Sequence, residues 1–337
     1  MILRIKQQGF TLLELMISLI LGLFVSAIAL QLFFTSQKSV TVQQGMMNLQ
    51  NSSLFGLGGM IDSIRLANLN SSQPYIDDKV LYGGIVLSAN NISNNLGSGT
   101  SNFKVDEALL TRGGIGESNL DGQKSDQLVI QYRVNTANQF DCEGKELTAN
   151  DYVVERYFLL EDINKNDPNK PLALACKAAR YTEAMAKTNT SLAELAGDEK
   201  NKGAIVIPRV DHFSVRLGVA YDGANADCTS ITQTTKDKDN KDVISNIVPD
   251  SQLDCFSYMN IEDYRALRGE KPHIVSVQLG LLVRSTDTTG NNKFFDPDHP
   301  YHVLNVEKKL SENDRNSLYL RSVVTQTIAL RNGFGIE

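Results

Sequence analysis

The feature that most constrains this chain is an apolar run over residues 10–34 that carries a single ionisable side chain, Glu14. A short leader, residues 1–9 with Arg4 and Lys6, precedes it. An apolar run of about 20 residues or more is long enough to cross a bilayer as a helix. A carboxylate in such a helix costs a few kcal/mol unless a partner or a function offsets it. The sequence therefore predicts a membrane helix in which Glu14 has a binding partner or a function.

The position of Glu14 suggests what that partner is. Cleavage between Gly9 and Phe10 would turn Phe10 into a free α-amino terminus. On a neighbouring subunit, that cation would pair with Glu14 in lipid, and the helix would act as an assembly device.

Two plainer interpretations compete with this one. An ordinary secretory signal also has a basic start and an apolar core, and residues 26–29 would supply its small-residue cleavage site. However, secretory cores do not normally contain a glutamate. An uncleaved membrane anchor leaves Glu14 unexplained.

Residues 6–14, KQQGFTLLE, resemble the prepilin signal of type IV pilins and of type II secretion pseudopilins. The resemblance implies that a prepilin peptidase cuts after Gly9, that Phe10 becomes the methylated terminus, and that Glu14 is the pairing carboxylate. Further segments resemble the PilW type of minor pilin and, more loosely, the shorter J-type pseudopilins. These segments are residues 64–65, 124–126, 281–285 and 328–332.

The charge distribution predicts orientation and excludes one class of partner. Arg4 and Lys6 precede the span, so the leader stays cytoplasmic and the rest is exported. The whole chain of 337 residues has a net charge of −6. Nucleic-acid binding depends on clustered Lys and Arg, so no direct nucleic-acid contact is predicted.

Four cysteines then lie in an oxidising compartment, where three pairings are open. Pairing of neighbours, Cys142 with Cys176 and Cys228 with Cys255, is favoured and would staple two long, polar, loop-like segments. A zinc cluster is disfavoured because no Cys-x-x-Cys spacing occurs.

The remaining pattern predicts an α+β fold of the type IV pilin kind, with the helix laid across an antiparallel sheet. Beyond the span, apolar residues recur three or four positions apart on one helix face, so the helix should continue to about residue 67. These residues are Met46, Leu49, Leu57, Ile61 and Ile64. Residues 68–122, including 112–116, have the composition of turns and loops. Strands are predicted at 128–134, 152–160, 213–221, 275–283 and 318–330, and short helices at 181–195 and 261–268.

These segments define four expected parts. Residues 1–9 form the leader, 10–34 the transmembrane and assembly helix, 35–67 its amphipathic continuation, and 68–337 the exported globular domain.

The sequence gives only weak signals for a catalytic or metal-binding site. His212 lies in an alternating strand, where an edge or half-exposed imidazole is expected, and Ser214 forms no dyad with it. The segment 296–302 and the Asp237, Asp239 and Asp242 series are better explained as polar loops. We therefore predict no enzyme activity, no cofactor and no metal.

The resemblance implies a minor pilin of a type IV pilus, in a complex that primes assembly and sits at the tip. Its partners would be the prepilin peptidase, other minor pilins, the major pilin and inner-membrane lipid. The globular domain would be periplasmic, and extracellular after assembly; twitching, adhesion and DNA uptake would depend on it indirectly. The alternatives are a J-type minor pseudopilin of a type II secretion system and a membrane-anchored periplasmic binding protein.

Overall fold

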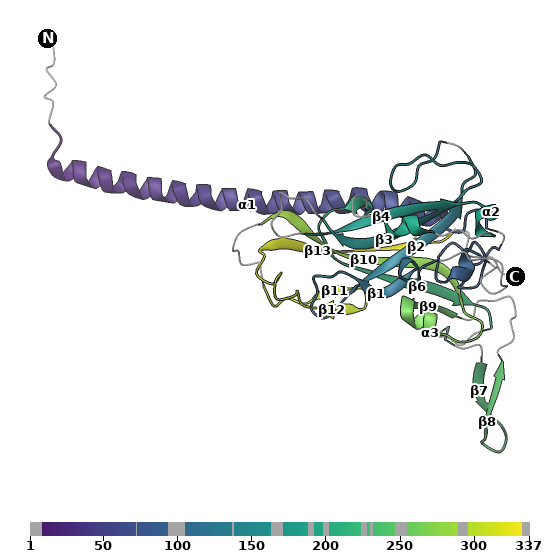
Figure 1. Cartoon of the computed structure of the whole chain (residues 1–337). Coiled ribbons are helices and arrows are strands. Elements are labelled where there is room, and N and C mark those ends of the chain that lie inside the picture. The colour runs from purple at the N-terminus through teal and green to yellow at the C-terminus, as the bar shows by residue number, and fades with distance from the viewer. Residues whose placement is uncertain are drawn as a thin grey trace, which may run out of the picture.

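A computed structural model describes residues 9–71, 73–93, 105–136, 138–162, 171–187, 192–197, 202–223, 228–229, 232–246, 255–288 and 296–331. In this part of the chain, one long helix is followed by two antiparallel sheets and two separate hairpins (Figure 1). The predicted α+β class, a long N-terminal helix packed on an antiparallel sheet domain, is confirmed.

The long helix α1 runs without interruption over Leu12–Leu66. At 1.5 Å per residue it is about 80 Å long. Its first half projects away from the body, and its second half lies along the sheets (Figure 1). Leu57, Met60 and Ile64 recur on one face and are buried there, whereas Met46, expected on the same face, is 44% exposed.

Sheet 1 is a meander of five antiparallel strands in the order β1-β2-β3-β4-β5. Each strand pairs with the next one in sequence, as consecutive strands usually do. The strands are β1 (Arg112–Gly116), β2 (Ser125–Arg133), β3 (Tyr152–Glu161), β4 (Leu172–Tyr181) and β5 (Ala204–Ile207).

Sheet 2 has four antiparallel strands in the order β13-β10-β6-β9. The long strands β10 and β6 lie at its centre, and β13 and β9 form its edges. The strands are β6 (Val210–Tyr221), β9 (Cys255–Asn260), β10 (His273–Thr288) and β13 (Tyr319–Ala329).

Shorter elements surround the two sheets. The hairpin β7–β8 (Thr232–Lys236 and Asp242–Asn246) extends away from the body, and β11–β12 (Tyr301–Val303 and Val306–Lys308) lies below β13 (Figure 1). The helices are α2 (Glu183–Ala186) and α3 (Ile261–Ala266), with 3₁₀ turns at Ala89–Asn91, Glu107–Leu109 and Ala193–Ala196.

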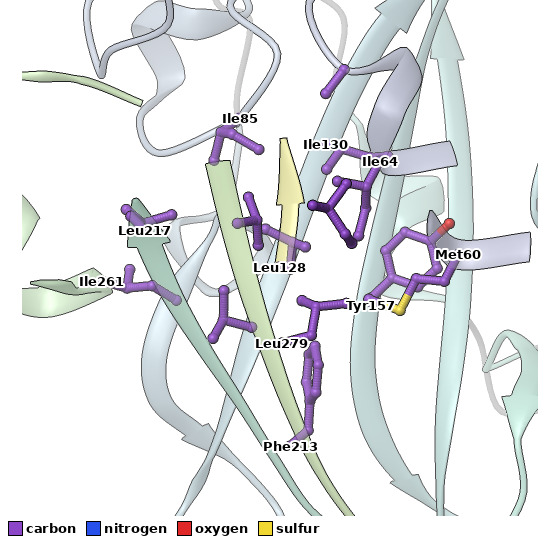
Figure 2. Close-up of a cluster of buried hydrophobic side chains, with 14 of the residues drawn as sticks. Met60, Ile64, Ile85, Leu128, Ile130, Tyr157, Phe213, Leu217, Ile261 and Leu279 are labelled. Atoms are coloured by element: carbon purple, nitrogen blue, oxygen red, sulfur yellow. The ribbon is translucent and has the colours of Figure 1, made fainter. Parts of the chain in front are cut away.

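One hydrophobic core joins α1 to both sheets. Figure 2 shows Met60 and Ile64 from α1 beside Tyr157 of sheet 1, with Phe213 and Leu279 of sheet 2 nearby. Because all three elements bury their apolar faces in the same core, the second half of α1 is an integral part of the domain.

Two polar side chains of β2 join the sheets at the edge of this core. The Ser125 hydroxyl accepts a hydrogen bond from the backbone N–H of Phe213 at 3.1 Å. The Asp126 carboxylate accepts one from the backbone N–H of Val215 at 2.7 Å and another from the Ser214 hydroxyl at 3.1 Å. Burial raises the pKa of Asp126, and these hydrogen bonds oppose that rise. The two side chains thus satisfy backbone N–H groups of β6 in the stretch that pairs with β10 but lies beyond the residues paired with β9.

Several sequence predictions need correction. Residues 112–116, expected to be a loop, form β1. Their glycine-rich composition gives little strand preference, but antiparallel pairing with β2 holds them as a strand. The helix expected at 181–195 is instead the end of β4, the single turn of α2 and a 3₁₀ turn, with residues 188–191 outside the described part. Strand β4 was missed because both of its faces are buried, which removes the alternation of polar and apolar residues.

Candidate functional site

The N-terminus of α1 is closed by a hydrogen-bonded pair, Thr11 and Glu14. The Thr11 hydroxyl accepts the backbone N–H of Glu14 at 3.3 Å. In return, the Glu14 Oε2 atom accepts the backbone N–H of Thr11 at 3.2 Å. This reciprocal arrangement is a capping box, which satisfies backbone donors that the first helical turn leaves unpaired. Glu14 therefore has a role within its own chain, which sequence reasoning had not assigned to it.

The surface of α1 next to this cap is almost entirely apolar and uncovered. Phe10 is 86% exposed, and Leu12 and Leu23 are 80% and 73% exposed. In the described part of the chain, α1 is the one helix long and apolar enough to cross a membrane. Burying a large apolar side chain is worth about 1.5–3 kcal/mol, so this surface needs lipid or other helices around it.

Two serine hydroxyls within the apolar run are satisfied by the helix backbone. Ser18 donates to the carbonyl of Leu15, and Ser26 donates to the carbonyl of Gly22, both at 2.9 Å. Such bonds hide the hydroxyl from its surroundings, as an apolar solvent requires. Glu14 is left as the ionisable group of the run.

Gly9 and Phe10, the predicted cleavage and terminal residues, lie exposed at the start of α1. A methyl group built on Gly9 would have no described atom within 4 Å. The fold itself therefore does not require a glycine at this position. Leader residues 1–8 lie outside the described part, and the processing roles of Gly9, Phe10 and Glu14 stay predictions.

The cysteines form Cys142–Cys176 and Cys228–Cys255, the pairing that neighbouring positions favoured. The first bond does not close a polar loop as expected. Cys176 is a fully buried residue of β4, and all of β3 lies between the two cysteines. The second bond encloses the β7–β8 hairpin.

Ion pairs lie on both sides of the first disulfide. Lys177 and Glu143 are paired at 2.8 Å with both side chains 5% exposed. Arg180 and Asp141 are paired at 2.7 Å, and the aspartate side chain is 1% exposed. The segment around Cys142 is therefore held against β4 by covalent and ionic contacts together.

A buried carboxylate, Glu155, connects the same disulfide to α1. It accepts hydrogen bonds from the Tyr157 hydroxyl at 2.7 Å, the backbone N–H of Cys142 at 2.9 Å and the Tyr132 hydroxyl at 3.1 Å. Ser63 of α1 also donates to it. Burial raises the pKa of Glu155, and these donors oppose that rise. Sequence reasoning missed this group; the signal was a glutamate inside the apolar run of β3.

His212 is buried in β6, a central strand of sheet 2, which corrects the expected edge or half-exposed imidazole. Its Nδ1 atom lies 2.9 Å from the Ser118 hydroxyl and 3.3 Å from the Ser125 hydroxyl. Burial lowers the pKa of His212 to about 4. The geometry is that of a neutral imidazole in a closed core, with no access for a substrate.

The two polar segments considered as metal sites serve local structure. In the first, His302 lies 3.2 Å from Glu307 in an exposed pair across the β11–β12 hairpin. In the second, Asp237 accepts the backbone N–H groups of Asp239 and Lys241, both at 2.9 Å, and so shapes the β7–β8 turn.

Comparisons with known proteins agree with the architecture of the chain. The model of the family described as type IV pilus-assembly protein W matches residues 163–332. The model of the prokaryotic N-terminal methylation motif matches residues 4–30. No curated protein matches the chain.

Among solved structures, the chain is similar to a type IV-like pilin from Thermus thermophilus. The two are 11% identical, and the similarity covers 65% of this chain and 83% of that one with a TM-score of 0.29. The W model spans half of the chain and the methylation motif coincides with the exposed start of α1. The chain therefore belongs to the family of type IV pilus-assembly protein W.

Proposed function

We propose that this protein is a non-enzymatic minor pilin that joins a priming complex at the tip of a type IV pilus. The observation that carries the proposal is the exposed, apolar first half of α1 with Glu14 at its start, inside a matched N-terminal methylation motif. Such a helix is held in the inner membrane before assembly and packs on equivalent helices afterwards.

The geometry of Glu14 is compatible with pairing and capping at the same time. Both of its bonds to Thr11 use Oε2. Its second oxygen, Oε1, makes no hydrogen bond to any residue that the structure describes. This oxygen is available to the α-amino group of a processed Phe10 on a neighbouring subunit. Cleavage after Gly9 leaves Thr11 in place, so the cap survives processing.

The domain on α1 suits a tip position. It carries two sheets, a protruding hairpin and two disulfides, more than is needed to pack a shaft. Twitching, adhesion and DNA uptake would then depend on this protein indirectly, through assembly.

The test separates the charge of Glu14 from its capping role. Glu14→Gln keeps an acceptor for the Thr11 N–H, because glutamine also completes a capping box. Glu14→Ala removes both the cap and the charge. We expect both variants to insert in the membrane and fold, and both to lose incorporation into sheared pili by at least about tenfold, a loss of about 1.4 kcal/mol.

The measurement is the amount of each variant that co-purifies with pilins after mild crosslinking. Incorporation of Glu14→Gln at the wild-type level would show that the charge is not used for pairing. Loss in Glu14→Ala alone would assign the residue to helix capping.

A J-type pseudopilin of a type II secretion system is the second candidate, because it uses the same helix. Deletion of the chain distinguishes the two: loss of surface pili supports the pilus, and loss of secreted enzymes supports the secretion system. A membrane-anchored periplasmic binding protein would retain residues 1–9, which mass spectrometry of the N-terminus detects. Processing by the prepilin peptidase predicts a chain that begins at a methylated Phe10.

A further inference from the structure

A polar cavity of about 500 Å³ lies where the segment after α1 meets the start of β10. Its lining includes Tyr75 and Asp77 from that segment and Tyr221 from the end of β6. On the other side lie Glu270, from the segment before β10, and His273, the first residue of β10. The backbone N–H of Ile274 donates to the carbonyl of Ile76 at 2.8 Å, which fixes the two sides relative to each other. The size is within the range of small-molecule sites.

Aromatic rings form one part of the lining. Tyr75 stacks on His273 with ring centroids 4.5 Å apart and planes inclined by 18°. Tyr221 meets the same imidazole edge-on at 5.3 Å. Because each ring is held by the next, the cluster offers a rigid apolar surface within a polar cavity.

The charged groups are held in place by the protein. The Tyr221 hydroxyl donates to Glu270 Oε2 at 2.9 Å. Asp77 Oδ1 accepts two backbone N–H groups, both at 2.7 Å. The Lys79 ammonium donates to the carbonyl of Gly269 at 3.1 Å. Each contact orients the side chain, and the second oxygens of Asp77 and Glu270 make no hydrogen bond to any described residue.

The balance of charge decides the chemical class of ligand. The lining carries two carboxylates, Asp77 and Glu270, and the ammonium group of Lys79. The ammonium of Lys271 is bound instead by Asp78 at 2.8 Å and by the carbonyl of Arg265 at 3.0 Å. The cavity therefore disfavours anions, and it offers both charged acceptors and a charged donor. Phosphate-rich ligands need a net positive site, and divalent metals need oxygen ligands without competing amines. A neutral ligand with many hydroxyl groups can bond to both kinds of charged side chain, since hydroxyls donate to carboxylates and accept from ammonium groups.

We propose that this cavity binds a neutral saccharide of one or two rings. The C–H face of a sugar ring packs on the rings of Tyr75, His273 and Tyr221. The sugar hydroxyls bond to Asp77, Glu270 and Lys79. Hydrogen bonds to charged partners are stronger than neutral ones, which compensates for the water that the sugar displaces. The proposal does not depend on where the chain sits in a pilus.

The experiment uses the full chain in detergent micelles and saturation-transfer NMR with three probes: maltose, lactose and N,N′-diacetylchitobiose. Tyr75→Ala removes the ring surface, and Glu270→Ala removes an exposed acceptor at no cost to the core. Tyr258→Ala is the matched control, because this ring is 41% exposed on β9 and does not line the cavity.

We expect at least one probe to bind, with affinity reduced about tenfold or more in Tyr75→Ala and Glu270→Ala, and unchanged in Tyr258→Ala. Thermal unfolding checks that each variant is folded; if Tyr75→Ala is not, Glu270→Ala alone decides. Absence of binding by all three probes would overturn the proposal. So would equal binding by Glu270→Ala and the wild type, or saturable binding of inorganic phosphate in place of the sugars.

Discussion

At the scale of single residues, the domain contains charged groups that are fully buried between β6, β10 and β13. Arg321 Nε donates to Asp211 Oδ2 at 2.6 Å, and both side chains are 0% exposed. Arg284 lies 3.8 Å from Asp211 and from Asp314, with its guanidinium 4.5 Å from the centre of the Tyr319 ring. Removal of one member of such a cluster leaves an uncompensated charge and typically costs about 3–5 kcal/mol. The cluster therefore fixes these strands relative to one another.

His212, next to Asp211, should make stability depend on pH. Its pKa is lowered to about 4 by burial, compared with 6.5 for an ordinary histidine. Well above pH 6.5 the imidazole is neutral in both states and its contribution is complete. As pH falls towards 4, His212 becomes protonated in the unfolded chain but stays neutral in the folded chain, so stability is lost. The loss should reach about 3 kcal/mol at most.

Chemical denaturation of the wild type and of His212→Asn, between about pH 7 and pH 4, measures this effect. Asparagine keeps an acceptor near the position of Nδ1 but does not titrate. The wild type should lose more stability over this range than the variant. Burial raises the pKa of Glu155, which acts in the opposite direction, but that contribution is common to both proteins and cancels. Parallel pH profiles would contradict the assignment to His212.

At the scale of elements, α1 approaches β5 very closely at Gly56. A Cβ atom on Gly56 would overlap the carbonyl oxygen of Val206 and the side chain of Ile207. The same atom on Gly58 or Gly59 would have no described atom within 4 Å. The three glycines thus have different roles: one allows close packing of helix on strand, and the other two only weaken the helix.

Substitution by alanine should therefore have opposite effects at neighbouring positions. Gly58→Ala should stabilise the protein by up to about 1 kcal/mol, because alanine has the higher helix propensity. Gly56→Ala should destabilise it by about 1–3 kcal/mol, the range for overpacking a close contact. Thermal unfolding of the two variants measures both effects. A stabilising Gly56→Ala would show that β5 can move away from α1 at little cost.

At the scale of the whole molecule, the two disulfides close loops of similar size, with sequence separations of 34 and 27. Loop length alone therefore predicts a similar stabilisation for each, about 2–4 kcal/mol. What differs is the surrounding structure. Cys142–Cys176 lies between the ion pairs Asp141–Arg180 and Glu143–Lys177, whereas Cys228–Cys255 is at the base of the protruding β7–β8 hairpin.

Removing each bond should consequently change a different property. Cys142→Ser with Cys176→Ser should lower global stability by about 2–4 kcal/mol and leave the native fold resistant to protease, because the ion pairs still hold residues 141–143. Cys228→Ser with Cys255→Ser should expose the hairpin to cleavage, since a two-stranded hairpin is marginal alone. Limited proteolysis with identification of the cut sites tests both. Cleavage near residue 142 in the first variant, or none between 228 and 255 in the second, would contradict this division.

The sequence by itself determined the features that depend on neighbouring residues. The apolar run with Glu14 and the three-to-four-residue spacing of Leu57, Ile61 and Ile64 specify α1. Period-two alternation specified most of β2, β6 and β10. These patterns are visible in one dimension because helix and strand geometry repeats over a few residues.

Only the tertiary structure decided what depends on residues far apart in the chain. It paired Arg112–Gly116 with β2, buried both faces of β4, and gave Asp126 and Glu155 their partners. It also brought Tyr75 onto His273 to form the wall of a cavity. Hydrogen bonds and burial between distant segments override local preference, because an unpaired polar group in a core costs more than a poor propensity.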